Sequence, residues 1–159
     1  MSVHSGGVLL YRYEHGELQV MLVHPGGPYW TNKDEGAWSI PKGVFEQNES
    51  PIEAARREFK EETGFDVDGE FIGLGQVKQR SNKVVHVWAL AKDVDAAAAR
   101  SNTFTMQWPR NSGQIREYPE VDRAQWFGLA EARRKILKGQ AEFVDRLARK
   151  LGIVPPHEQ

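Results

Sequence analysis

The sequence predicts an α+β fold in which a mixed β-sheet is sandwiched between α-helices. Apolar runs of strand length recur along most of the chain, one helix carries capping residues at both ends, and two further helical stretches close the sequence. Because a sheet buries its apolar faces against helices, this order of elements indicates a layered arrangement of helices and strands.

The first two apolar runs predict a β-hairpin. GVLLYRY (7–13) and LQVMLVH (18–24) flank EHG, which is a turn sequence. Residues 25–36 are rich in Gly, Pro and Asn, which predicts a long loop. AWSIP (37–41) is a short strand candidate, and a second loop is expected between it and Ser50.

The next segment predicts a helix over residues 51–63. Ser50 is a favourable N-cap, Pro51 suits the first helical position, and Glu53 completes a capping box with Ser50. Gly64 is placed to end the helix, because glycine readily adopts the left-handed backbone found after many helices.

The rest of the chain returns to strands and then to helices. Further strands are predicted at 71–79, 84–91, 103–108 and 123–129. Closing helices are predicted at 130–138 and 140–151, separated by Gly139, and the run 95–99 predicts one helical turn within a connection. The tail, residues 153–159, is expected to be frayed.

Length and composition favour one domain over residues 1–159. The formal net charge of -1 gives no electrostatic footprint for a nucleic acid or a membrane surface. The absence of cysteine excludes disulfides, thiolate zinc sites and a cysteine nucleophile. The N-terminal apolar run is too short for a signal peptide and no run reaches transmembrane length, so a cytoplasmic protein is expected. The oligomeric state stays open.

Three glutamates, Glu58, Glu61 and Glu62, share one side of the predicted helix, although like charges at these spacings repel. They fall beside the apolar stripe that is expected to be buried, whose members are Ile52, Ala55 and Phe59. Carboxylates at the edge of a core are costly unless a positive charge joins them. A divalent cation such as Mg²⁺ would serve all three, and a solvated charged helix face is the alternative.

The residues around these glutamates form the pattern G-x5-E-x7-R-E-F-x-E-E-x-G-F, from Gly43 to Phe65. This pattern resembles the Nudix box at every fixed position. The resemblance implies the Nudix fold, a sheet between helices, and hydrolysis of a phosphoanhydride bond in a nucleoside diphosphate-linked substrate with Mg²⁺ or Mn²⁺. The order of elements fits that fold over nearly the whole chain, although only the box is specific.

The resemblance also implies roles for individual residues. Glu58, Glu61 and Glu62 are expected to be the metal ligands, and the backbone carbonyl of Lys42 commonly supplies another ligand in the family. Glu58 can also share the role of base.

The remaining box residues are expected to shape the site. Arg57 and Glu49 are expected to orient the loop and the helix, with a plain surface position as the alternative for Glu49. Gly43 and Gly64 are expected to permit a tight loop and a helix end.

A further glutamate outside the box is the base in many Nudix enzymes, and two candidates lie in REYPEVDRAQW. These are Glu117 and Glu120. Glu120 is favoured because Pro-Glu before an aromatic strand resembles the corresponding region of dinucleoside tetraphosphate hydrolases. An exposed loop glutamate is the alternative for either residue.

Two local segments resemble asymmetric dinucleoside tetraphosphate hydrolases. AWSIPKG (37–43) resembles their Trp-x-x-Pro-Lys-Gly segment, and NKVVHVWAL (82–90) resembles their Lys-x-Val strand. By this resemblance Lys42 and Lys83 hold phosphates, with an aggregation-blocking edge lysine as the alternative for Lys83. Trp38 is expected in the core rather than against a base.

Two long segments depart from that subfamily and resemble predicted bacterial Nudix nucleoside triphosphate pyrophosphohydrolases. The loop 25–36 carries aromatic side chains, Tyr29 and Trp30, together with Lys33, that could stack on a base or cover the sheet. The segment 104–120 offers arginines for phosphates, namely Arg110 and Arg116.

Three functional hypotheses follow. The favoured one is an enzyme that acts on nucleoside or dinucleoside polyphosphates, with a small nucleotide as its partner. The second is hydrolysis of another nucleoside diphosphate derivative, such as a nucleotide sugar, NADH or an RNA 5′ end; a nucleic acid is disfavoured because no basic stripe is visible. The third is a non-catalytic nucleotide-sensing module.

Overall fold

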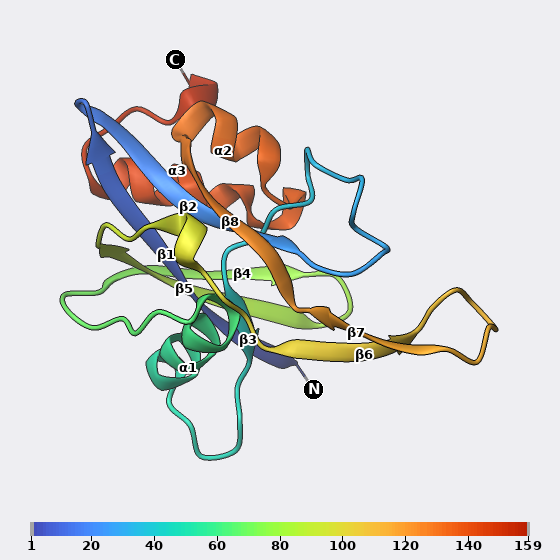
Figure 1. Cartoon of the computed structure of the whole chain (residues 1–159). Helices are drawn as coiled ribbons and strands as arrows, with labels where there is room; N and C mark the ends of the chain where they lie inside the picture. The colour runs from blue at the N-terminus through green and yellow to red at the C-terminus, as the bar shows by residue number, and fades with distance from the viewer. Residues whose placement is uncertain (1, 159) are drawn as a thin grey trace.

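The computed structural model describes residues 2–158 and contains a β-sheet with helices on both faces (Figure 1). Within those residues the main sheet has six strands. These strands are β1 (Val3–Glu14), β2 (Glu17–Pro25), β3 (Lys42–Val44), β4 (Ile72–Gln79), β5 (Lys83–Ala91) and β8 (Val121–Gly128). Five of them lie in the spatial order β4–β5–β1–β2–β8, and β3 pairs with β1. The prediction of a mixed sheet between helices is confirmed.

The strands β1 and β2 form the predicted hairpin. Tyr11 lies opposite Val20, and the turn is made by His15 and Gly16, which both have positive φ angles. Two residues of this conformation match the right-handed twist of the strands that they join.

One parallel pairing makes the sheet mixed. β1 and β5 run parallel, with Val3 beside Lys83 and Tyr11 beside Ala91, whereas the other named pairings of the sheet are antiparallel. A parallel pair needs a long crossover connection. Here that connection contains α1 (Pro51–Thr63), which the chain lays against one face of the sheet.

Each face of the sheet has its own apolar core. On one face Val8 and Leu10 of β1 pack with Phe59 of α1. On the other face Leu9 of β1 packs with Phe143 of α3 (Ala141–Lys150) and its neighbours. Because successive strand residues point to opposite faces, β1 serves both cores with consecutive side chains.

The local capping signals produce α1 as predicted. The Ser50 side chain accepts a hydrogen bond from the Glu53 backbone N–H, and Gly64 ends the helix in the left-handed conformation with φ of 81°. The Gly64 N–H donates to the carbonyl oxygen of Lys60 over 2.7 Å. The helix therefore begins and ends at the residues that its sequence specifies.

Three short segments differ from the predictions. Residues 37–41 form only isolated bridges, through Trp38 and Ser39, rather than a strand. Residues 42–44, predicted as loop, form β3 against Gly6 and Gly7. The segment 115–119, which was not predicted as regular structure, is the strand β7.

β7 (Ile115–Pro119) pairs with β6 (Thr103–Gln107) in a separate two-stranded sheet. Figure 1 shows this hairpin projecting away from the main sheet. The predicted helical turn before it is confirmed as the 3₁₀ turn η1 (Ala96–Ala98), which the side chain of Asp95 caps.

The chain closes with α2 (Leu129–Lys135), the 3₁₀ turn η2 (Lys138–Gln140), α3 (Ala141–Lys150) and the 3₁₀ turn η3 (Pro156–Glu158). Of the helices formed by residues 2–158, none is long and apolar enough to cross a membrane. The segment predicted to be frayed is 153–159. Ile153 packs on the core, Pro155 is buried, and His157 lies 3.3 Å from the Asp145 carboxylate. Gln159 lies outside the described residues.

Candidate active site

The acidic side of α1 lies at the rim of the core, as its sequence predicts. Phe59 is completely buried, while the neighbouring side chains of Glu58 and Glu61 retain 16% and 40% of their exposure. Glu62 is also partly buried. The three carboxylates are therefore placed where burial and mutual repulsion both act on their charge.

Arg57 joins the acidic residues to the preceding loop. Its guanidinium donates to both oxygens of the Glu49 carboxylate over 2.7 and 3.0 Å, and to Glu58 over 2.7 Å. It also donates to the Val44 carbonyl over 3.0 Å and lies 3.3 Å from Glu61. This arrangement supports the predicted orienting role of Arg57 and Glu49.

The contact between Gly43 and Glu58 explains the glycine of the box. A Cβ atom on Gly43 would lie 2.0 Å from the carboxyl carbon of Glu58. No side chain fits in that space, so the Glu58 carboxylate can lie against the backbone of β3 only where residue 43 is glycine.

Burial and neighbouring charges change the protonation of the acidic side. Burial, together with the charge of Glu58, raises the pKa of Glu62 to about 8. Burial also raises the pKa of Glu58, against the opposing effect of Arg57. The Arg57 hydrogen bond holds the pKa of Glu49 below its ordinary value. Two carboxyl groups therefore keep their protons more readily than free glutamates do.

Lys42 and Glu120 lie beside Glu62. Glu62 accepts a hydrogen bond from the Lys42 backbone N–H, and the Lys42 ammonium lowers the pKa of Glu62 while the Glu120 charge raises it. Burial lowers the pKa of Lys42 itself. The structure therefore brings Glu120, 58 residues further along the chain, to the acidic rim of α1.

These groups border one cavity of about 230 Å³ between the sheet and the long loop after β2. Its polar lining is Ser39, Lys42, Glu62 and Glu120. Its apolar and aromatic lining is Val23, Pro25, Trp30, Ala37, Val121 and Leu137. An apolar pocket with a few convergent polar groups is the usual form of a small-molecule site.

The comparisons with known proteins decide the family. A family model described as the NUDIX domain matches residues 4–147.

The chain belongs to the Nudix hydrolase family.

Several solved structures share the Nudix fold at low sequence identity. The NUDIX domain of Shewanella oneidensis NrtR, complexed with ADP ribose, has a TM-score of 0.65 and 19% identity over 95% of this chain and 89% of that chain. A C. elegans Ap4A hydrolase has a TM-score of 0.62 and 18% identity, over 94% of this chain and 98% of that chain. The MutT protein from Methanosarcina mazei Go1 has a TM-score of 0.62 and 21% identity, over 94% of this chain and 95% of that chain.

Several other residues singled out in the sequence lie away from the cavity. Glu117 is exposed on β7 opposite Thr105. Arg110 and Arg116 are exposed on the same projecting hairpin, where Arg116 donates to the Gln114 side chain over 2.8 Å. Only Glu120, directly after β7, reaches the candidate site of this Nudix domain.

The aromatic residues divide between core and cavity. Trp38 is in the core, as predicted, with its indole N–H donating to Asp34 over 2.8 Å. Trp30 lines the cavity, whereas Tyr29 is exposed. The Lys33 ammonium lies 4.9 Å from the centre of the Tyr29 ring and 5.1 Å from the centre of the Trp30 ring.

Sequence reasoning missed two glycines of β1 that support the site. A Cβ on Gly6 would lie 2.9 Å from the Pro51 carbonyl oxygen at the start of α1, and a Cβ on Gly7 would lie 2.9 Å from Lys42 Cβ. These glycines let α1 and β3 approach the sheet closely. The Gly-Gly pair at the start of the predicted strand 7–13 was the available signal, because glycine in a strand often marks close backbone approach.

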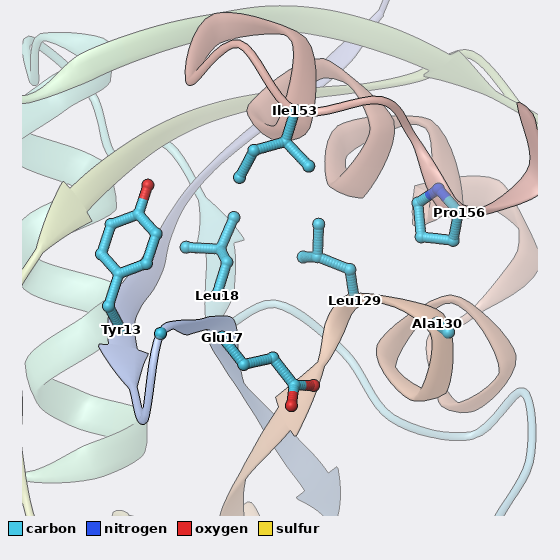
Figure 2. A pocket seen from close by; sticks show the side chains of 8 residues that line it. Tyr13, Glu17, Leu18, Leu129, Ala130, Ile153 and Pro156 are labelled. Carbon is cyan, nitrogen blue, oxygen red and sulfur yellow. The ribbon is translucent and has the colours of Figure 1, made fainter. Parts of the chain in front are cut away.

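A second cavity, about 420 Å³ in volume, lies at the far end of β1 (Figure 2). Figure 2 shows Leu18, Leu129 and Ile153 around it, with the Tyr13 ring at one side and the Glu17 carboxylate below. It has no cationic side chain in its lining, so it offers nothing to bind the phosphates of a nucleotide.

The donor chemistry of the acidic rim fits a hard divalent cation. Glu58, Glu61 and Glu62 offer carboxylate oxygens, which Mg²⁺ prefers. Burial raises the pKa of Glu58 and of Glu62, so their ionised forms gain stability from a bound cation. Within residues 2–158, however, no three His, Asp or Glu side chains are already arranged as a metal-binding group. In this conformation Arg57 engages Glu58 and Glu61 instead.

Proposed function

We propose that this Nudix hydrolase cleaves a phosphoanhydride bond in a nucleoside diphosphate-linked substrate, and that the substrate is a nucleoside or dinucleoside polyphosphate. The observation that carries the proposal is the position of Glu62. Its partly buried carboxyl group borders one cavity together with the Lys42 ammonium and the Glu120 carboxylate. The cavity thus combines two carboxyl groups and one ammonium group with an apolar wall.

Glu58, Glu61, Glu62 and the backbone carbonyl of Lys42 would hold Mg²⁺ or Mn²⁺. When bound, a divalent ion offsets the charge of the phosphates and of the departing oxygen. Glu58 is held for this task from two sides, because Arg57 donates to it and the bare backbone of Gly43 accommodates it. Glu49 fixes Arg57 in turn.

Glu120 is the favoured proton acceptor for the attacking water. It follows β7 directly, and its backbone is held on both sides, since its N–H donates to Asn102 over 2.9 Å and its carbonyl accepts from Gly26 over 3.0 Å. Its side chain is exposed at the cavity, where water is available. A fixed carboxylate beside the reacting phosphate suits general base catalysis.

Lys42 and Lys83 are proposed to bind phosphates, and Trp30 is proposed to stack on the base. The Lys83 charge lowers the pKa of Lys42, so the two ammonium groups act on the same region. An anionic phosphate chain between them relieves that repulsion. Trp30 supplies an aromatic face in the wall of the same cavity, and aromatic rings stack well on bases.

A substrate panel tests the proposal. The protein with Mg²⁺ is incubated with the NTPs and dNTPs, diadenosine tetraphosphate, ADP-ribose, NADH and a sugar nucleotide, and the products are separated by chromatography. Conversion of the polyphosphates, lost on addition of EDTA, supports the proposal. Turnover of ADP-ribose, NADH or the sugar nucleotide alone assigns the second class of substrate, and ligand binding without any turnover assigns a sensing module.

A further inference from the structure

A strongly basic groove of about 770 Å³ lies next to the candidate site, between the β4–β5 hairpin and the start of α3. Its cationic lining residues are Lys78, Arg80, Lys83 and Lys138. Its one acidic lining residue, Glu142, is already paired with Arg146. The groove therefore carries an excess of positive charge, although the whole chain has a formal net charge of -1.

The four cations of the basic groove are not accounted for by the fold. Among residues 2–158, no acidic side chain forms an ion pair or hydrogen bond with any of them, and all four are exposed. Cations with a structural role normally have a carboxylate or carbonyl partner. Lys78 alternates with Val77 and Gln79 along β4, so it points to the other face of the sheet. The other three unpaired cations repel one another, and an anionic ligand removes that cost.

The basic groove is continuous with the candidate active site. Leu137 lines both hollows. In the strand register Gly7 lies opposite Lys42 and Val3 lies beside Lys83, and residues 3 and 7 of β1 point to the same face. Lys42 and Lys83 thus stand on one face of the sheet.

One small side chain of β1 lies on that face between the strand positions of these two lysines. Between Val3 and Gly7, the residue of β1 on the same face is Ser5, which lies beside Val85. On the far side of the groove Gly139 lets Gln79 approach η2, because a Cβ there would lie 3.2 Å from the Gln79 amide nitrogen. A chain of phosphates can therefore run from Lys42 past Lys83 towards Lys138.

We propose that the basic groove is a distal phosphate subsite that receives the far end of a dinucleoside polyphosphate while its scissile phosphates lie at Glu62. This inference rests on the proposed function and narrows its substrate class to molecules with a long phosphate chain. The turn η2 leads into α3, whose N-terminus at Ala141 adds the partial positive charge of a helix N-terminus to the groove.

The confined extent of the charge favours a small polyanion over a nucleic acid. A nucleic-acid strand needs cations along a stripe that follows many phosphates. Here the unpaired cations are grouped around one hollow, on a chain without an overall basic charge. An RNA with a 5′ triphosphate shares the phosphate chemistry, so it belongs in the test as the competing occupant.

The test compares long and short substrates in the variant Arg80→Ala/Lys138→Ala. We expect the ratio of kcat/KM for diadenosine tetraphosphate to kcat/KM for ATP to fall about tenfold, through KM, because two exposed ion pairs are lost. Arg80→Lys/Lys138→Arg should restore the ratio. Lys150→Ala, which removes one exposed charge from the last turn of α3, is the control and should keep the wild-type ratio.

Each other outcome overturns the subsite. An unchanged ratio in an active double variant means that the groove does not bind the far phosphates. An equal loss for both substrates means a structural role, which a lowered Tm would reveal. A loss confined to an RNA with a 5′ triphosphate would assign the groove to RNA instead.

A binding measurement separates failure of the subsite from failure of the proposed function. Inorganic tetraphosphate is titrated calorimetrically, in EDTA, into the wild type and the double variant. Weaker binding by about tenfold in the variant supports a phosphate subsite even if the wild type hydrolyses neither substrate. Equal affinities overturn the subsite, whatever the activity.

Discussion

Arg57 and Glu49, eight residues apart, form a two-point ion pair in which Nε and Nη2 donate to both carboxylate oxygens over 2.7 and 3.0 Å. The side chains of Arg57 and Glu49 keep only 23% and 13% of their exposure. A partly buried fork-to-fork pair fixes orientation as well as distance. The loop that carries Glu49 and the helix that carries Glu58 are therefore fixed in position relative to each other.

Arg57→Lys should destabilise the protein by about 1–2 kcal/mol, because an ammonium cannot make the paired hydrogen bonds. Urea unfolding of Arg57→Lys, Glu49→Gln and the double variant measures the coupling between the two residues. A double variant whose loss equals the sum of the single losses would contradict the pairing. Activity should fall as well, since Glu58 loses its 2.7 Å partner.

Gly43→Ala should lower kcat by about 100-fold and leave most of the fold intact. The added Cβ would lie 2.0 Å from the Glu58 carboxyl carbon, so the carboxylate must move, and small displacements of positioned groups are costly in catalysis. Gly73→Ala is the matched control, because its Cβ meets nothing closer than 3.9 Å. Equal kcat values for the two variants would contradict this role of Gly43.

Glu61→Gln and Glu62→Gln should each abolish measurable turnover, with a loss in kcat of about 10³-fold or more, because each removes a proposed ligand charge. Both variants should remain folded, and Glu62→Gln should melt at a higher temperature than the wild type in EDTA above pH 8, where the wild-type carboxyl group is charged and partly buried. Glu53→Gln, on the exposed side of the same helix, is the control and should keep its activity. Full activity in both test variants would refute the proposed site.

Stability without metal should depend on pH through Glu62. Its pKa rises from 4.5 in the unfolded chain to about 8 in the folded protein, so the folded state binds the extra proton between these values. This contribution is complete below pH 4.5 and is lost as the pH rises to 8. The Tm of the wild type in EDTA should therefore fall, relative to Glu62→Gln, by about 10 °C across that window.

The comparison with Glu62→Gln isolates this group from others that titrate nearby in pH. Burial lowers the pKa of His86, which gives the opposite pH dependence, but it does so in both proteins. Excess Mg²⁺ at pH 8 should raise the Tm of the wild type more than that of Glu62→Gln. Parallel melting curves of the two proteins from pH 5 to 8 would contradict the assignment.

Glu120→Gln should lower kcat by about 100-fold or more with little change in KM, because the proposed proton acceptor is gone. Glu117→Gln is the matched control, three residues earlier on the exposed hairpin. A wild-type kcat for Glu120→Gln would transfer the role of base to a glutamate of α1.

The elements that the sequence predicted best depend on local interactions. The helix α1 has its N-cap, first-turn proline and terminal glycine within its own segment, so its bounds of Pro51–Thr63 agree with the prediction. The strand β3 was missed because it exists through pairing with Gly6 and Gly7, more than 30 residues earlier. β7 was missed because Ile115–Pro119 contains charges and a proline and has no buried face.

The same distinction applies to the site. The acidic side of α1 was predictable because helical geometry fixes which residues share a face. The approach of Glu120 to Glu62 depends on how β8 pairs with β2, and residue spacing does not encode that. The basic groove could not be predicted from the sequence for the same reason, because Arg80 and Lys138 come together only after the sheet and α3 have packed.

The separate β6–β7 sheet gives the protein two levels of local stability. Its two strands pair only with each other, and Ile115 on it remains 67% exposed. An isolated two-stranded ribbon is marginally stable in water. Its amide hydrogens should therefore exchange with solvent well before those of the six-stranded sheet.

Glu120 lies between the less stable β6–β7 sheet and the more stable main sheet. Its N–H donates to Asn102 at the base of the ribbon, while its neighbour Val121 already belongs to the main sheet. Opening of the ribbon releases the backbone hydrogen bond that positions Glu120 but leaves the acidic side of α1 in place. Heating should thus disable the proposed proton acceptor below the temperature at which the domain unfolds, so activity would be lost reversibly before the global melting transition.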